Sequence, residues 1–155
     1  MSRDLQIRDM VSGDYNFIID SWLNQFKNSS EFARRIKHAI YFEKQAKVIE
    51  KLIARSKVRV ASLCSDPSVI VGYLVFEPPP EKPIAHFVYV KPSFRRMGIA
   101  RELVQGLNIE TCTFTHWTFV MDYIHGCVRK DKDTGIKGLV TGAYPNMVYD
   151  PFLAR

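Results

Sequence analysis

Hydrophobic and polar residues alternate at the start of the chain and then change to helical spacing. Leu5 and Ile7 stand between polar neighbours, and Val11 extends the same series of odd-numbered positions. A period of two is typical of a half-buried strand. Over residues 15–27 the apolar side chains recur at intervals of three and four, which predicts a helix. These helical positions are Phe17, Ile18, Trp22, Leu23 and Phe26.

A longer helical stretch is expected from about Ser30 to Arg55. Asn28 precedes it as a candidate N-cap, and Glu31 follows three residues later, which is the spacing of a capping box. The length of the stretch allows for two helices, and lysines and arginines occupy much of its polar surface. Its apolar positions are Phe32, Ile36, Ile40, Ile49, Leu52 and Ile53.

Three β-rich runs follow, at residues 58–64, 68–77 and 84–90. A tight Ser-Asp-Pro connection joins the first run to the second. The proline-rich segment 77–83 joins the second to the third, and it must be a loop because proline donates no hydrogen bond to a sheet. The three runs therefore predict consecutive strands.

The rest of the chain predicts a helix, a further strand and a less regular C-terminal part. Residues 98–110 have helical spacing and residues 112–119 are β-rich. Beyond them we expect one short helix at 121–127, a charged glycine-containing loop at 128–138 and a short strand within 146–153. The element order is β-α-α-β-β-β-α-β, followed by this C-terminal part.

Composition indicates one globular domain spanning residues 1–155. The chain is 46% hydrophobic and 25% charged, as in ordinary globular proteins. It has no apolar run of the roughly 18 residues that a membrane span needs, and its charged N-terminus does not look like a signal peptide, so we expect a cytoplasmic protein without membrane contact. The formal charge of +6 favours an anionic partner such as nucleic acid, an acidic protein or a phosphorylated cofactor.

The cysteines and histidines do not predict a disulfide framework or a metal site. Cys64, Cys112 and Cys127 are odd in number in a chain without a secretory signal. Cys112, His116, His125 and Cys127 match none of the standard zinc spacings. We therefore expect no metal.

The segment 90–104 predicts an anion-binding turn. It follows a strand, passes through Gly98, and continues as a helix, with Arg95, Arg96 and Arg101 around the glycine. The first N–H groups of a helix have no partner within the helix, and they attract anions. Glycine lets the backbone approach a ligand closely. The pattern is short, so by itself it does not specify which anion is bound.

The turn and the order of elements together resemble a known family. Residues 95–100, RRMGIA, resemble the Q/R-x-x-G-x-G/A pyrophosphate loop of the GNAT acetyltransferase superfamily, and Val90, Pro92 and Arg95 resemble its V-x-P-x-x-R pattern. The element order over residues 5–119 is also similar to the family's α/β (α+β) fold, a mixed and mostly antiparallel central sheet flanked by helices. The C-terminal segment YDPFL makes the chain similar to small members encoded by bacteriophages.

This resemblance implies acetyl-CoA as the cofactor and assigns its binding residues. The strand at 84–90 would carry a bulge that separates it from the next strand, and pantetheine would bind in the gap. Backbone groups of Val88, Tyr89 and Val90 would contact it, and His116 would line the same gap. The pyrophosphate would be held by Arg95, Arg96, Met97, Gly98, Ile99, Ala100 and Arg101.

The resemblance also gives candidate catalytic residues, with alternatives. His86 stands where the family often has a glutamate base, on a strand face that alternation would share with Val88 and Val90. Its imidazole could accept a proton at neutral pH, or it could simply pack in the core. Tyr123 is the candidate general acid, with Tyr144 as its rival.

We therefore expect an N-acetyltransferase in which a primary amine attacks acetyl-CoA directly in a ternary complex. The basic segment 34–57 disfavours a polyamine as the acceptor and favours a protein lysine or N-terminus, or an amine attached to an anionic carrier. The alternative is a non-catalytic module of the same fold that binds CoA, an acidic host protein or nucleic acid through that basic face.

Overall fold

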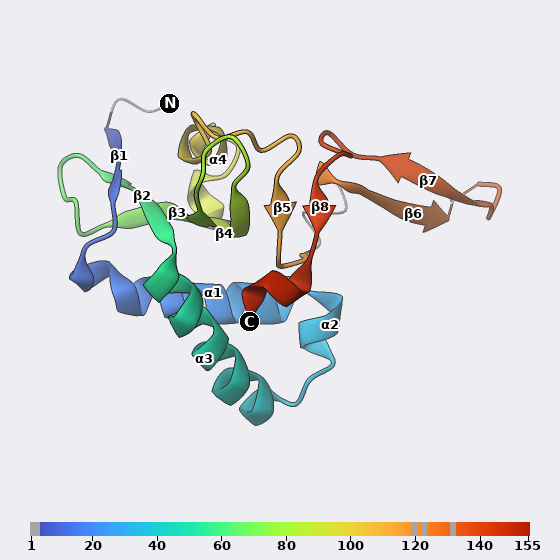
Figure 1. Ribbon diagram of the computed structural model, residues 1–155, viewed down its shortest axis with the longest axis horizontal. Coiled ribbons are helices and arrows are strands. Elements are labelled where there is room, and N and C mark those ends of the chain that lie inside the picture. The colour runs from blue at the N-terminus through green and yellow to red at the C-terminus, as the bar shows by residue number, and fades with distance from the viewer. Residues whose placement is uncertain (1–3, 119–120, 122–123, 131–132) are drawn as a thin grey trace.

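The computed structural model describes residues 4–118, 121, 124–130 and 133–155, which build a six-stranded sheet with helices on both faces (Figure 1). The strand order is β1-β2-β3-β4-β5-β8. Strands β1 to β4 pair antiparallel, whereas β5 pairs parallel with both β4 and β8. The strands are β1 (Leu5–Asp9), β2 (Lys57–Leu63), β3 (Ile70–Glu77), β4 (Ile84–Val90), β5 (Thr113–Phe114) and β8 (Val148–Tyr149).

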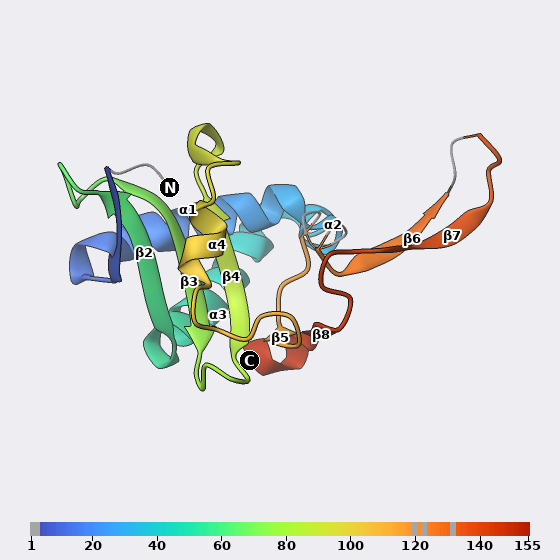
Figure 2. The same cartoon turned by 90° about the horizontal axis from the view of Figure 1, so that it is seen from above.

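The helices divide between the two faces of the sheet (Figure 2). The α-helices are α1 (Tyr15–Ser29), α2 (Glu31–Arg34), α3 (His38–Arg55) and α4 (Ile99–Leu103), and the 3-10 helices are η1 (Ser12–Asp14), η2 (Pro92–Phe94) and η3 (Pro151–Ala154). On one face Tyr73 and Val75 pack against α1 and α3. On the other face Leu74 packs against Ile99 and Leu103 of α4. The expected fold class, a mostly antiparallel sheet flanked by helices, is confirmed.

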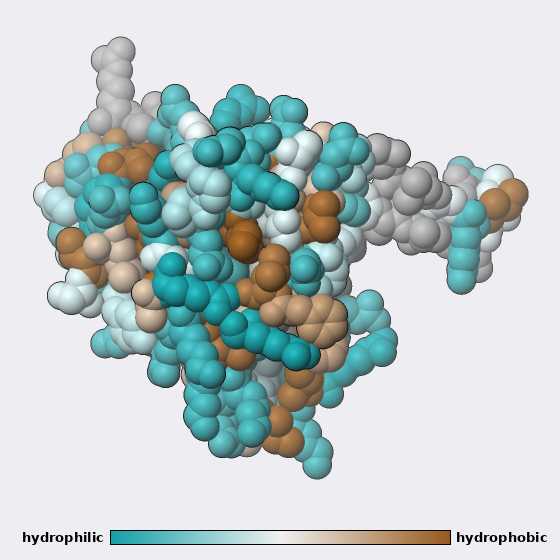
Figure 3. Space-filling view, in the orientation of Figure 1, coloured by the Kyte–Doolittle hydropathy of each residue, from teal (hydrophilic) through white to brown (hydrophobic). Residues whose placement is uncertain are grey.

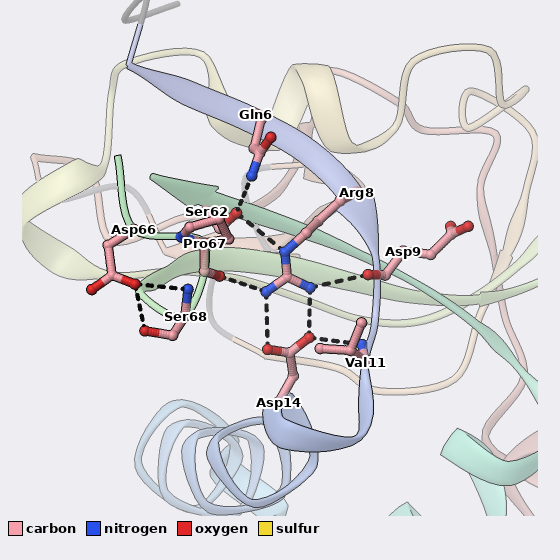
Figure 4. Close-up of polar contacts among 9 residues, drawn as sticks. All are labelled: Gln6, Arg8, Asp9, Val11, Asp14, Ser62, Asp66, Pro67 and Ser68. Carbon is pink, nitrogen blue, oxygen red and sulfur yellow. Dashed lines mark hydrogen bonds and ion pairs between the residues drawn. The ribbon is translucent and has the colours of Figure 1, made fainter. Parts of the chain in front are cut away.

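An ion pair joins the first strand to the residue that precedes the first long helix (Figure 4). Arg8 of β1 donates to both carboxylate oxygens of Asp14, at 2.7 and 3.0 Å, and to the carbonyl of Pro67 at 2.7 Å. Burial alone would raise the pKa of Asp14, but the hydrogen bonds from Arg8 and from the N–H of Val11 outweigh it and hold the pKa below its usual value. The pair fixes where α1 begins.

The long helical stretch expected between residues 30 and 55 consists of two helices, α2 and α3. The expected cap at Asn28 is wrong, because α1 continues through it to Ser29. Ser30 takes the N-cap position instead, and its hydroxyl accepts a hydrogen bond from the N–H of Ala33 at 3.3 Å. The chain then turns and continues as α3 from His38.

The helix expected at 98–110 is shorter than predicted and ends at Leu103. Arg59 of β2 donates to the carbonyls of Leu103 and Gln105, at 3.0 and 2.7 Å, and so satisfies groups at the helix C-terminus. Gly106 follows with φ 80°, which turns the chain away from the helical path. The β-rich run at 112–119 is also shorter as a strand, with only Thr113 and Phe114 in β5.

The charged loop expected at 128–138 is wrong. Strands β6 (Gly126–Lys130) and β7 (Lys137–Thr141) pair antiparallel as a separate hairpin that extends away from the main sheet (Figure 1). The expected helix at 121–127 overlaps β6 at its end, and its residues 122–123 lie outside the described part of the chain. The short C-terminal strand is confirmed as β8. In the described part of the chain, no helix is long and apolar enough to cross a membrane.

Candidate functional site

Strand β4 contains a bulge at His86. Val75 of β3 lies opposite Phe87, and the next residue of β3, Phe76, lies opposite Ala85, so His86 is an extra residue on β4. Beside β5, the register pairs Ile84 and Ala85 of β4 with Thr113 and Phe114. The N–H of Thr115 then donates to the carbonyl of Ala85 at 3.2 Å. The bulge expected in residues 84–90 is therefore present, and it marks the end of the pairing between β4 and β5 in the described residues.

A cavity of about 270 Å³ opens where β4 and β5 stop pairing. Its walls come from β4, from α4, from the segment that contains β5, and from the C-terminal part of the chain. Ala100 and Arg101 line it at α4, Val88 at β4, and Tyr144 and Met147 at the C-terminal part. The cavity therefore reaches the start of the helix that follows the arginine-rich turn.

The bulge changes the direction in which His86 points. Its Nε2 lies 2.6 Å from Oε2 of Glu77, and Arg55 at the end of α3 also contacts this Glu77 oxygen, at 3.3 Å. His86 thus lies on the α1 and α3 side of the sheet, as does Phe87, which packs in the cluster of those helices. Val90 instead packs with the α4 cluster. The expectation that His86 shares a face with Val88 and Val90 is wrong, because a bulge interrupts the alternation of a strand.

His86 belongs to a continuous chain of buried and part-buried hydrogen bonds. Its Nδ1 lies 2.8 Å from Oγ1 of Thr115, and this oxygen lies 2.9 Å from Nδ1 of His116. Nε2 of His116 lies 3.2 Å from the side-chain nitrogen of Gln45 on α3. Together with the contact to Glu77, four bonds join residues from α3, β3, β4 and the segment after β5.

When both imidazoles are neutral, the hydrogen bonds of this series can all be formed only if they donate in one direction, from Gln45 toward Glu77. The Gln45 amide donates to His116, whose Nδ1–H donates to Thr115. The Thr115 hydroxyl then donates to Nδ1 of His86, and the Nε2–H of His86 donates to the carboxylate of Glu77. Every ring nitrogen thus has a partner. The imidazoles are set to pass protons from His116 toward Glu77, which is the partly exposed end of the chain.

Burial keeps both imidazoles neutral near pH 7. Desolvation lowers the pKa of His86, although the hydrogen bond and the charge of Glu77 act in the opposite direction. Desolvation is also the main reason why the pKa of His116 falls to about 3, and the charge interaction with the neighbouring His86 acts in the same direction. His116 is also enclosed by aromatic rings, with its centroid 4.9 Å from that of Phe26 and 5.3 Å from that of Trp22.

The turn before α4 has the backbone that an anion site needs. Arg96 has φ 64° and Gly98 has φ 82°, so two left-handed residues bracket Met97. A Cβ added to Gly98 would meet no atom within 4 Å, which shows that the space above this residue is open. Ile99, by contrast, is buried and anchors the helix start to the sheet. Arg95, one of the exposed arginines around this turn, donates from Nε to the carbonyl of Val90 at 3.0 Å.

The structure places the remaining site residues that the sequence predicts, except Tyr123. Val88 is 40% exposed and lines the cavity, and Tyr89 stacks on Tyr73 with ring centroids 5.3 Å apart. Tyr144 lines the cavity. Tyr123 lies outside the described residues. His116 lines the cavity, and its contact with a ligand stays a prediction. The described residues contain no group of three or more metal-ligating side chains placed to share an ion.

Sequence reasoning did not identify Gln45, Glu77 or Thr115. Gln45 lies on a helix otherwise read as basic, and Thr115 is one polar residue in a β-rich run. Glu77 gave the clearest available signal, because it is a single carboxylate that closes an otherwise apolar strand. Their partnership with His86 depends on strand register, which the sequence does not reveal.

Comparison with known proteins identifies a family. Residues 19–108 match the acetyltransferase (GNAT) family. Among solved structures, the chain is similar to a possible acetyltransferase from Clostridium difficile 630, at 18% identity over 65% of this chain and 66% of that one, with a TM-score of 0.45. It is also similar to the PaiA N-acetyltransferase from Thermoplasma acidophilum in complex with coenzyme A, at 17% identity over 67% and 68%, with a TM-score of 0.44.

A third similar structure is a histone acetyltransferase HPA2 and related acetyltransferase from Corynebacterium glutamicum, at 21% identity over 65% of this chain and 68% of that one, with a TM-score of 0.48. The chain thus spans about two-thirds of the length of these structures. They come from bacteria and an archaeon and give the expected bacteriophage resemblance no support. A search of curated proteins finds no match.

Proposed function

Because the chain belongs to the acetyltransferase (GNAT) family, we propose that it is an N-acetyltransferase that transfers the acetyl group of acetyl-CoA to a primary amine in a ternary complex. The observation that carries this proposal is the continuity of the site. The gap where β4 leaves β5 opens into a cavity, and the cavity reaches Ala100 and Arg101 in the first turn of α4, which directly follows the turn at Gly98. A long thioester with a phosphate-bearing end needs such a continuous path.

The residues of the turn fit a pyrophosphate. N–H groups at the start of α4, from Ile99 to Arg101, have no partner inside the helix. The left-handed Gly98 leaves the approach to them free of side-chain atoms. Arg96 and Arg101 are exposed beside these groups and would add charge-assisted hydrogen bonds to phosphate oxygens.

The open edge of β4 fits the pantetheine arm and the reacting group. Val88 to Val90 follow the bulge, where β4 and β5 no longer pair, so backbone groups on this edge remain for an extended ligand. Bound acetyl-CoA would supply the thioester carbonyl carbon that the amine attacks. An N–H near Val90 would polarise its oxygen. The C–N bond forms as the C–S bond breaks, the amine loses a proton, and the sulfur gains one.

The hydrogen-bond chain supports His86 as the acceptor of the amine proton. Both of its ring nitrogens are occupied, so a proton would reach it through a neighbour rather than by direct contact. A proton taken at Nε2 of His116, in place of the Gln45 bond, would pass through Thr115 to Nδ1 of His86. The Glu77 carboxylate then stabilises the imidazolium. A base of this kind contributes about 10²–10⁴-fold to a rate.

The general acid that protonates the sulfur is a tyrosine in this proposal. Tyr123 is the candidate from the sequence, and it stays a prediction because it lies outside the described residues. Tyr144 is the alternative, and its place in the cavity wall favours it. The phenylalanine variants at these two positions, each lacking only a hydroxyl, distinguish them by the loss of kcat.

The acceptor in this proposal is an amine on a protein, either a lysine or the N-terminus. Helix α3 brings the half-buried Gln45 to the His116 end of the hydrogen-bond chain. Its exposed charged side chains include Lys44, Lys47 and Lys51 together with Glu43 and Glu50. Hydrophilic residues cover much of the surface over α3 (Figure 3). A basic surface repels free polyamines and attracts acidic protein segments around a target amine.

Two measurements test the function. Calorimetry at near-physiological salt should show binding of CoA and acetyl-CoA, and no binding would overturn the proposal. Incubation with acetyl-CoA and a cell lysate, followed by mass spectrometry, should then reveal acetylated amines that are absent when acetyl-CoA is omitted. Binding of CoA without any acetylated product would favour the alternative, a non-catalytic module of the same fold.

A further inference from the structure

From the cavity between β4, α4 and β5 we infer that the protein accepts CoA thioesters with straight acyl chains longer than acetyl, up to about six carbons. The inference rests on the proposed function and concerns the donor that the same site selects. We assign the acyl chain to the part of the cavity formed by Ile109, Cys112, Phe114, Met121, Ile124 and Met147, which we call the acyl wall.

The cavity is much larger than an acetyl group requires. Its volume is about 270 Å³, whereas an apolar cavity of about 150 Å³ is enough to bind benzene, a ligand of six carbon atoms. An acetyl group adds only three heavy atoms beyond the sulfur. The pantetheine arm takes the part of this volume beside Val88 and α4. With acetyl as the only acyl group, the acyl wall would be left without contacts, which forfeits dispersion energy.

The wall of the cavity has one part that offers polar contacts to the pantetheine arm and another part that does not. Beside α4 the lining includes Arg101 and the strand edge at Val88, where backbone hydrogen bonds are available. The acyl wall belongs to a separate hydrophobic cluster, in which Cys112, Phe114 and Met147 are buried. Its side chains offer almost no polar partners, so it suits hydrocarbon rather than the amide-bearing pantetheine arm.

The acyl wall begins close to the bulge, so a chain reaches it from a thioester bound at the Val88 end of the open β4 edge, where the cavity begins. Ala85, the last residue of β4 that pairs with β5, packs against this cluster and lines the cavity. The two strands thus close the cavity at the inner end of the gap. Met121 and Met147 are both in the wall, and methionine side chains adapt to ligands of different lengths.

The sulfhydryl group of Cys112 is part of this surface without adding charge. Burial raises the pKa of Cys112 to about 11, so the thiol is neutral at physiological pH and packs as a small apolar group. A larger apolar residue at this position would shorten the space available to a chain. Cys112 is therefore the position at which chain length can be tested.

The experiment measures affinities of acetyl-, butyryl- and hexanoyl-CoA for the wild-type protein by calorimetry, without an acceptor. We expect the dissociation constant to fall with chain length by up to about fourfold per buried methylene. A constant or rising value beyond acetyl would overturn the inference and leave the proposed function intact, because acetyl-CoA still binds. If no CoA thioester binds, the proposed function itself fails. This series requires no variant to fold.

A pair of cysteine variants then tests the location. Cys112→Leu should reduce the affinity for hexanoyl-CoA relative to acetyl-CoA by about tenfold or more. The matched control is Cys64→Leu, because Cys64 is exposed and outside the cavity, and it should keep the wild-type ratio. If circular dichroism shows that Cys112→Leu is folded and this variant also keeps the wild-type ratio of the two affinities, the acyl chain binds elsewhere and the assignment is wrong.

Discussion

Nε2 of His86 lies 2.6 Å from the carboxylate of Glu77, although without the bulge His86 would lie opposite Phe76, on the other face of the sheet from Glu77. The bulge that inserts His86 into β4 turns its side chain toward the end of β3, where Glu77 closes the strand. A carboxylate at this position favours the protonated form of the imidazole, whereas burial disfavours it. These two opposing effects on the pKa of His86 suit a group that accepts a proton only briefly.

The first prediction tests His86 as the proton acceptor. His86→Ala should lower turnover by about 10²-fold or more at neutral pH and leave the dissociation constant of acetyl-CoA nearly unchanged, because the loss falls on proton transfer. Initial rates and calorimetry on the same preparation provide the measurement. His86→Glu should recover part of the rate if water enters the site. Full activity in the folded His86→Ala protein, with only a lower melting temperature, would mean that His86 only packs.

The second prediction concerns Gly98 and has a matched control. Gly98→Val should abolish detectable CoA binding, because a β-branched residue is strained at φ 82° and its side chain occupies the open approach to the helix start. Gly106→Val places the same side chain at φ 80°, also in open space, beyond the end of α4. It should lose similar stability and still bind CoA in calorimetry. Equal loss of binding in both variants would show that strain alone is responsible.

The third prediction tests whether arginine charges or backbone N–H groups of the turn bind the phosphates of CoA. Arg96→Ala should weaken CoA binding by about tenfold and reduce its salt dependence, since an exposed charge-assisted contact is screened by salt. Arg95 is a less clean test because it also holds the carbonyl of Val90. Lys47→Ala removes the same charge from α3 and serves as the control. A change of less than about twofold in the Arg96 variant would assign the phosphates to backbone groups.

The fourth prediction concerns stability in acid. The folded state keeps His116 neutral down to a pKa of about 3, whereas in the unfolded chain its ordinary value is 6.5. The unfolded state therefore binds more protons below pH 6.5, and the free energy of unfolding should fall toward pH 3 by up to ~1.4 kcal/mol per pH unit for this group.

Denaturant unfolding at several pH values measures this slope. His116→Gln should reduce it between pH 6 and 4, and His38→Gln, at an exposed histidine of α3, is the control that should retain it. Asp14 acts in a lower window, because its lowered pKa gives stability that is lost only as the carboxylate protonates below its ordinary value of 3.8. An unchanged slope in the His116 variant would contradict the assignment.

The sequence by itself determined the features that depend on neighbouring residues. The period-two and helical spacings located β1, α1, β2, β3 and β4, because buried faces recur at the period of each element. The turn from Val90 to Arg101 was also readable, since the left-handed residue before the helix is a glycine and the arginines are adjacent to it. Local preferences were sufficient for these parts.

Only the tertiary structure decided what depends on pairing between distant segments. The hairpin of β6 and β7 has a charged sequence that predicts a loop, and only the antiparallel pairing of the two segments shows them to be strands. Helix α4 ends early at Leu103, where Arg59 from β2 donates to the carbonyl of Leu103 and to that of Gln105 beyond the helix. Likewise, the bulge at His86 arises from the register of β3 against β4. That one-residue offset turned His86 toward Glu77 and Thr115, and a pattern of residue types along the chain carries no information about such an offset.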